Sequence, residues 1–117
     1  MQIHLNTDHN LKGGESLESS VRATVEDALS RFSAHITRVE VHLADENAAK
    51  SGGADKRCVM EARVEGHAPV AVTEHASTVG QAIDGAAERL VHRLDHILGR
   101  QRDQRVRAVA PVVDELP

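Results

Sequence analysis

The sequence has almost no aromatic residues: Phe32 stands alone, with no tryptophan or tyrosine among 117 residues. The hydrophobic core must therefore be built from aliphatic side chains. The shortage also bears on nucleic-acid binding, because proteins that read single-stranded RNA commonly stack its bases on exposed aromatic side chains. We expect that any nucleic acid bound by this chain is held through its backbone and its shape.

Cysteine is equally scarce, since Cys58 is the single one and cannot form an internal disulfide. Its position in an alternating apolar pattern indicates a buried thiol rather than a reactive one. No apolar run approaches the roughly 20 residues of a membrane span. The first residues show neither the cationic region nor the apolar core of a signal peptide. We therefore expect a cytoplasmic protein with no membrane association.

Motifs of catalysis and of metal binding are weak or missing. No nucleophile stands at a recognisable spacing from a base, and the Ser-Gly-Gly sequence at 51–53 lies between two expected strands rather than before a helix. His92 and His96 are four residues apart, as in metal-binding pairs, but Asp95 falls on the opposite side of the helix. We expect no enzymatic activity, no cofactor, no small-molecule substrate and no metal.

Charge is distributed unevenly along the chain, whose formal net charge is −4. Residues 1–55 carry five Lys and Arg against nine Asp and Glu, whereas residues 56–107 carry nine against seven. The second half is therefore locally basic on an acidic molecule. The acidic net charge by itself argues against a simple nucleic-acid-binding protein. The uneven distribution of charge nevertheless allows the second half of the chain to form a locally basic surface.

Hydrophobic periodicity predicts four strands and two helices in the order β-α-β-β-β-α. The expected strands cover Gln2–Asn6, Ile36–Ala44, Lys56–Glu65 and Val70 to about Glu74, and the expected helices cover Glu15–Ala34 and Ser77 to about Arg100. Ser16 is expected to cap the first helix, and Ser77 or Thr78 the second. This order predicts an α+β fold with one four-stranded sheet and two helices packed on one of its faces.

The third strand sets the expected register. Cys58, Met60, Ala62 and Val64 should face the helices, opposite Arg57, Glu61 and Arg63. Residues 1–105 are expected to form this single domain. Residues 106–117 are expected to be a flexible tail, because the helical pattern stops at Gly99 and Pro111 blocks regular pairing.

The last expected helix sorts its charges by side. Its apolar arc is formed by Ile83, Ala86, Ala87, Leu90, Leu94, Ile97 and Leu98; Arg89, Arg93, His96 and Arg100 follow one flank, and Asp84, Glu88 and Asp95 the other. An ordinary surface helix mixes its charges to gain pairs four residues apart. A helix with all its basic residues on one flank, beside a stripe that faces the core, is suited to lie along a phosphate backbone. The alternative interpretation is that both charged flanks are simply exposed to solvent and bind nothing.

The element order, the Ala-Ile-Asp sequence at 82–84 and the spacing of Leu90 and Leu94 resemble the ribosome hibernation factors. That family includes the short hibernation-promoting factor, the ribosome-associated inhibitor (protein Y) and sigma-factor modulation proteins. The resemblance covers about residues 1–102. It implies a fold close to the double-stranded-RNA-binding domain. It also implies binding to the small ribosomal subunit, where mRNA and tRNA anticodon stems would lie, which stops translation in resting cells.

The resemblance also implies a set of rRNA-binding residues. The family's basic positions on the last helix fall on Arg89, Arg93 and Arg100, and positions often basic in relatives are His92 and His96 here. Lys56, Arg57 and Arg63, on or beside the sheet, complete the predicted set. This chain departs from the family in its acidic balance and in Gly80, where relatives often carry an aromatic residue.

Two functions stay open at this stage. The first is a ribosome-associated translation inhibitor that contacts rRNA phosphates. The second is a non-catalytic protein-interaction module descended from the same family, whose acidic surface binds a protein partner. Salt separates the two, because binding through phosphates weakens steeply with ionic strength and a hydrophobic protein interface does not.

Overall fold

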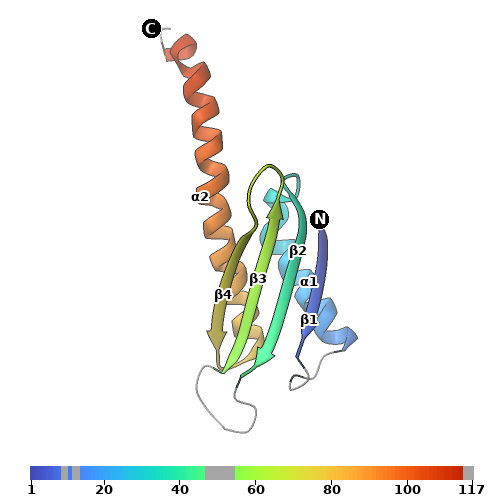
Figure 1. Ribbon diagram of the computed structural model, residues 1–117. Helices are drawn as coiled ribbons and strands as arrows, with labels where there is room; N and C mark the ends of the chain where they lie inside the picture. The colour runs from blue at the N-terminus through green and yellow to red at the C-terminus, as the bar shows by residue number, and fades with distance from the viewer. Residues whose placement is uncertain (9–10, 12–13, 47–54, 115–117) are drawn as a thin grey trace.

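The computed structural model describes residues 1–8, 11, 14–46 and 55–114, and for residues 100–114 it describes the backbone alone. Its elements, labelled in Figure 1, are β1 (Gln2–Thr7), α1 (Glu15–Leu29), the short 3₁₀ helix η1 (Ser30–Phe32), β2 (Ile36–Asp45), β3 (Lys56–Val64), β4 (Val70–Ala76) and α2 (Val79–Asp114). The predicted β-α-β-β-β-α order is confirmed. None of the helices in the described parts is long and apolar enough to cross a membrane.

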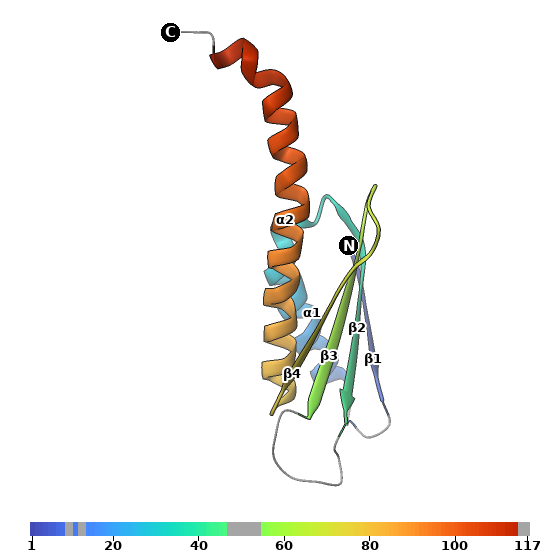
Figure 2. The same cartoon turned by 60° about the vertical axis from the view of Figure 1, so that its left-hand side comes forward.

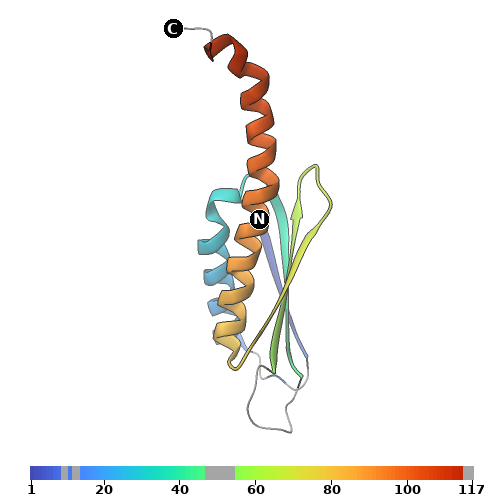
Figure 3. The same ribbon diagram turned by 90° about the vertical axis from the view of Figure 1, so that its left-hand side faces the viewer.

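The four strands form one sheet in the order β1-β2-β3-β4. The β1 and β2 strands are parallel, because α1 carries the chain back between them, and the two later pairings are antiparallel. Both helices lie on the same side of the sheet and leave its other side open, as Figure 3 shows. Because of the strand order, β1 and β4 are the edge strands of the sheet. The α2 helix runs beside β4 (Figure 1).

The register of β3 is the predicted one. Cys58, Met60 and Ala62 are fully buried and Val64 nearly so, whereas Arg63 is exposed. The core is aliphatic, as expected, with Phe32 as its aromatic member. Strand alternation determined this result, because a shift of one residue would have turned the whole apolar set towards solvent.

Burial makes the Cys58 thiol chemically inert. Removal from water, together with the smaller effect of the nearby Glu74 carboxylate, raises the pKa of Cys58 to about 12. We expect no reaction with a thiol reagent in the folded state at pH 8 and rapid labelling in urea. Because the unfolded thiol ionises first, the free energy of unfolding should hold below about pH 8.5 and fall as pH rises towards 12. Labelling kinetics and urea titrations check this, and Cys58→Ala should lack that part of the alkaline decline.

The start of α1 differs from the prediction. Gly14, not Ser16, is the N-cap, with φ of 144°, a conformation that L side chains rarely adopt. The Gly14 carbonyl accepts the first helical hydrogen bond, from the Glu18 N–H at 2.9 Å. The α-helix also ends at Leu29, before the predicted end at Ala34, and tightens into η1. Short 3₁₀ turns of this kind are common at helix ends.

The start of α2 matches one of the two predicted caps. Thr78 Oγ1 accepts a hydrogen bond from the Gln81 N–H at 3.1 Å, and Ser77 instead donates to the Gln81 side chain at 2.9 Å. The helix continues to Asp114, however, beyond its predicted end near Arg100 (Figure 2). An existing helix extends at little cost through residues of high helix propensity such as Arg, Gln and Ala, even where no apolar pattern marks it.

Deletion of residues 108–117 should change the melting temperature by less than about 2 °C, because few stabilising contacts would be lost. Among residues with described side chains, Ile97 and Leu98 are the last in α2 that pack against the core. Thermal unfolding followed by circular dichroism measures the effect. A fall of 10 °C would mean that the segment docks on the domain. The flexible tail at 106–117 stays a prediction, and residues 115–117 lie outside the described residues.

Candidate nucleic-acid interface

The apolar arc of α2 sets the direction of both charged flanks. The apolar side chains of Ile83, Ala86, Ala87, Leu90 and Leu94 are buried in the core, and Ile97 and Leu98 are partly buried, as predicted. Because β4 runs along one side of this helix and α1 along the other, the basic flank comes to the β4 edge and the acidic flank to α1. The sequence predicted two flanks, and the packing decided what each one meets.

The basic flank forms one wall of a groove of about 530 Å³ at the β4 edge. Arg89, His92 and Arg93 line it from α2, and the 71–73 segment of β4 lines it from the sheet. The spacing of these three side chains by three and four residues brings them onto one helical surface. All three are exposed. The structure therefore unites three of the predicted site residues in a single cationic groove.

The two remaining α2 candidates lie further along the helix. His96 is exposed one turn beyond His92 and does not line the groove. Arg100 belongs to the helix, and its side chain lies outside the described ones. Within the described part of the chain, no group of three His, Cys, Asp or Glu residues is placed to hold a metal ion.

The sheet candidates lie elsewhere and are occupied by carboxylates. Arg57 Nε lies 3.9 Å from Glu46 Oε1, and Arg63 Nε lies 4.0 Å from Glu61 Oε1, both on the open side of the sheet. The Lys56 ammonium lies between two aspartates, at 3.2 and 3.3 Å, and hydrogen bonding, first of all to Asp45, raises the pKa of Lys56. These cations are therefore separate from the groove.

Ion pairing along the strands also balances charge on the open face. Arg38 and Arg63 are cross-strand neighbours, as are Glu40 and Glu61, so like charges lie side by side. Arg38 relieves this by pairing with Glu40 on its own strand at 2.7 Å, as Arg63 does with Glu61. A face balanced in this way offers little net attraction for a polyanion.

Almost every cation with a described side chain is paired in the same manner. The ion-paired residues are Arg22, Arg31, Arg38, Lys56, Arg57, Arg63 and Arg89. Among the Lys and Arg residues with described side chains, Arg93 is the one with no ion pair. Among the residues whose side chains the structure describes, positive charge is therefore most available at the β4 groove.

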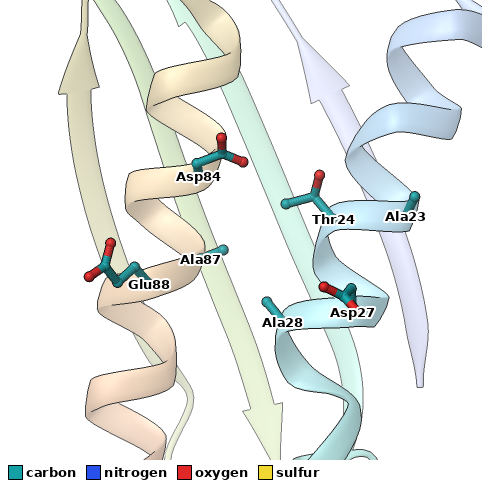
Figure 4. A pocket seen from close by; sticks show the side chains of 7 residues that line it. All are labelled: Ala23, Thr24, Asp27, Ala28, Asp84, Ala87 and Glu88. Atoms are coloured by element: carbon teal, nitrogen blue, oxygen red, sulfur yellow. The ribbon is translucent and has the colours of Figure 1, made fainter.

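The acidic flank faces α1 across a second groove, of about 460 Å³. Asp84 lines this groove from α2 and Asp27 from α1, and Ala28 and Ala87 point towards each other between the helices, whereas the Glu88 carboxylate lies on the side of α2 away from α1 (Figure 4). Further along, Asp95 pairs with Arg31 of η1 at 2.6 Å. Sequence reasoning missed Asp27 and Arg31, because nothing local to α1 or η1 indicates that these elements pack beside this flank.

Sequence reasoning also missed Glu74. Its carboxylate oxygen lies 3.5 Å from Arg89 Nε. The strand pattern did hold a signal, because Glu74 occupies the helix-facing series of positions that begins with Val70 and Val72.

The fold and the groove define a small α+β domain that presents a basic helix flank at the edge of its sheet. A family described as Sigma 54 modulation protein / S30EA ribosomal protein matches residues 6–102. The match spans most of the sequence, and the chain therefore belongs to this family. Membership confirms the predicted resemblance, indicates a ribosome-associated modulation protein, and gives no indication of an enzyme.

Solved structures support the same fold. The N-terminal domain of protein Y from Thermus thermophilus is similar, with a TM-score of 0.67 and 21% identity over 83% of this chain and 99% of that one. A ribosomal subunit interface protein from Coxiella burnetii is similar with a TM-score of 0.63 and 13% identity, over 85% and 99%. No curated protein sequence gives a significant match.

Proposed function

We propose that this protein is a cytoplasmic translation inhibitor that binds the small ribosomal subunit in the mRNA and tRNA channel through rRNA phosphates. Occlusion of the channel would stop translation or store idle ribosomes, without catalysis. The observation that carries this proposal is the family match over residues 6–102. The structure contributes the surface that could perform it.

The cationic groove suits a phosphate backbone. Arg89 and Arg93 lie one turn apart, about 6 Å along the helix axis. Arginine offers planar, forked donors that match phosphate oxygens. His92 and His96 add ring nitrogens on the same stretch of α2. Contacts of this kind fix position without reading sequence, which agrees with the lack of aromatic residues.

The other predicted contacts have a secondary role in this proposal. Lys56, Arg57 and Arg63 already hold carboxylates, so each must give up an ion pair before it can contact a phosphate. Arg100 continues the basic flank in the sequence. We therefore assign most of the binding energy to the α2 residues of the groove.

Sedimentation with purified ribosomal subunits tests the function. At about 50 mM salt the protein should travel with small subunits in a sucrose gradient and not with large ones. Raising the salt to about 200 mM should release most of it, because contacts to several phosphates give a steep salt dependence. Failure to co-sediment with small subunits at the lower salt concentration would remove the ribosome proposal.

A second candidate partner is suggested by the groove between the helices. Asp27, Asp84 and Glu88 would suit a basic protein segment, such as one on a ribosomal protein. If this alternative is the main function, Asp84→Asn with Glu88→Gln should abolish partner binding, and charge reversal at Arg89 and Arg93 should leave it intact.

A further inference from the structure

Glu74 is held in place beside the cationic groove. Its side chain is 27% exposed, and its Oε1 accepts a hydrogen bond from the His75 N–H at 3.2 Å. Gly85 of α2 makes room for it, since a Cβ at that position would come within 2.5 Å of Glu74 Oε2 and 2.7 Å of its Cγ. The carboxylate is therefore packed against the helix rather than free in solvent.

This fixed carboxylate acts on one of the two groove arginines. Arg89 follows Gly85 by one helical turn, and its Nε lies 3.5 Å from Glu74 Oε2. Arg93 is one turn further on, and no ion pair of this residue appears among the described side chains. Two arginines of the same flank thus differ in their electrostatic state, one partly neutralised and one not.

We propose that Glu74 is a positioning residue that attenuates the affinity of the groove for polyanions by holding and partly neutralising Arg89. This inference rests on the proposed function. A phosphate at Arg89 competes with the carboxylate for the guanidinium N–H donors and also lies close to a negative charge that packing on Gly85 keeps in place. Both effects weaken binding relative to a groove with two free arginines.

The attenuation should appear in binding and hardly in folding. A partly exposed ion pair contributes little to stability. When Glu74 no longer carries a charge, in contrast, Arg89 is fully available to a phosphate. Its contact then releases one additional counter-ion from the RNA, and the salt dependence of binding becomes steeper. A merely structural role for Glu74 would change the melting temperature and leave the salt slope unaltered.

The test compares Glu74→Gln with Glu26→Gln. Both remove one negative charge, but Glu26 is exposed on α1 and lines neither groove. At about 100 mM salt, Glu74→Gln should bind small subunits about three- to tenfold more tightly, with a salt slope steeper by up to about one. Glu26→Gln should stay within about twofold of the parent. Gly85→Ala, which displaces the Glu74 side chain, should shift affinity in the same direction as Glu74→Gln.

A double substitution assigns the effect to Arg89. In an Arg89→Gln background, Glu74→Gln should no longer tighten binding by more than about twofold. Elution from heparin, a polyanion unrelated to the ribosome, provides a second readout, and Glu74→Gln should elute at higher salt than Glu26→Gln. The inference is overturned if Glu74→Gln binds no more tightly than the parent, or if both single variants shift equally.

The heparin result separates this inference from the proposed function. If the parent fails to bind small subunits while Glu74→Gln still elutes later from heparin, the ribosome proposal fails and the role of Glu74 stands. If Arg89 and Arg93 prove essential for subunit binding while Glu74→Gln is neutral in both assays, the role of Glu74 alone is lost. Circular dichroism confirms that each variant is folded.

Discussion

Reversal of charge at Arg89 and Arg93 should reduce binding to small ribosomal subunits about a thousandfold while the protein stays folded. A unit charge about 4 Å from a phosphate is worth about 1 kcal/mol in water, so a reversal costs about twice that. Two reversals therefore cost about 4 kcal/mol, and each 1.4 kcal/mol is tenfold in affinity. Both side chains are exposed, so the free energy of unfolding should change by less than about 1 kcal/mol.

The matched control for this variant reverses Arg22 and Arg31, which lie on α1 and in η1. It changes the net charge equally but leaves the β4 groove intact. Its subunit affinity should stay within about fivefold of the parent. Binding measured over a salt series, after melting curves for each variant, gives the comparison. Equal losses in the two variants would show that net charge rather than the groove governs binding.

Truncation of Leu90 to alanine should cost about 2 to 5 kcal/mol of stability, the usual range for a buried leucine. Leu90 is fully buried in the middle of the apolar arc of α2. Its loss leaves a cavity between the helix and the sheet that a tightly packed aliphatic core cannot easily fill. For a domain of this size the melting temperature should fall by roughly 10–20 °C.

Leu98→Ala is the matched control for the core substitution. Leu98 belongs to the same helix and loses the same atoms, but it is only partly buried. The cost should be roughly 1 kcal/mol or less. Urea titration of both variants tests the difference. Similar losses at the two positions would mean that the core extends further along α2 than burial indicates.

The acidic net charge of the chain is compatible with a locally basic binding surface. At physiological ionic strength, charges separated by more than about 8 Å are largely screened. The distant acidic residues of the N-terminal half then count for little beside the side chains of the groove. Lowering the salt concentration should therefore strengthen RNA binding less for this protein than for a uniformly basic one. At low salt the negative net charge of the whole protein is less screened, and its long-range repulsion of the RNA increases.

The sequence alone determined the elements and their buried faces. Alternation in β3 is a local property, and it placed Cys58 and Met60 in the core. The 3.6-residue period of α2 likewise placed Leu90 and Leu94 inward and Arg89 and Arg93 on one flank. Local reasoning failed where no periodic pattern existed, at the Gly14 cap and in the continuation of α2 past Arg100.

The tertiary structure alone decided which charges meet. Arg31 pairs with Asp95 across 64 positions of sequence, and Arg89 pairs with Glu74 of the edge strand. Such pairs depend on how the helices are docked and rotated on the sheet, which the packing of all core side chains sets together. A periodic pattern specifies which face of an element is buried, but not which neighbour lies beside its polar flanks. For that reason the sequence predicted eight rRNA-binding residues as one set, whereas the structure brings three of them, Arg89, His92 and Arg93, together in the β4 groove, with Glu74 beside Arg89.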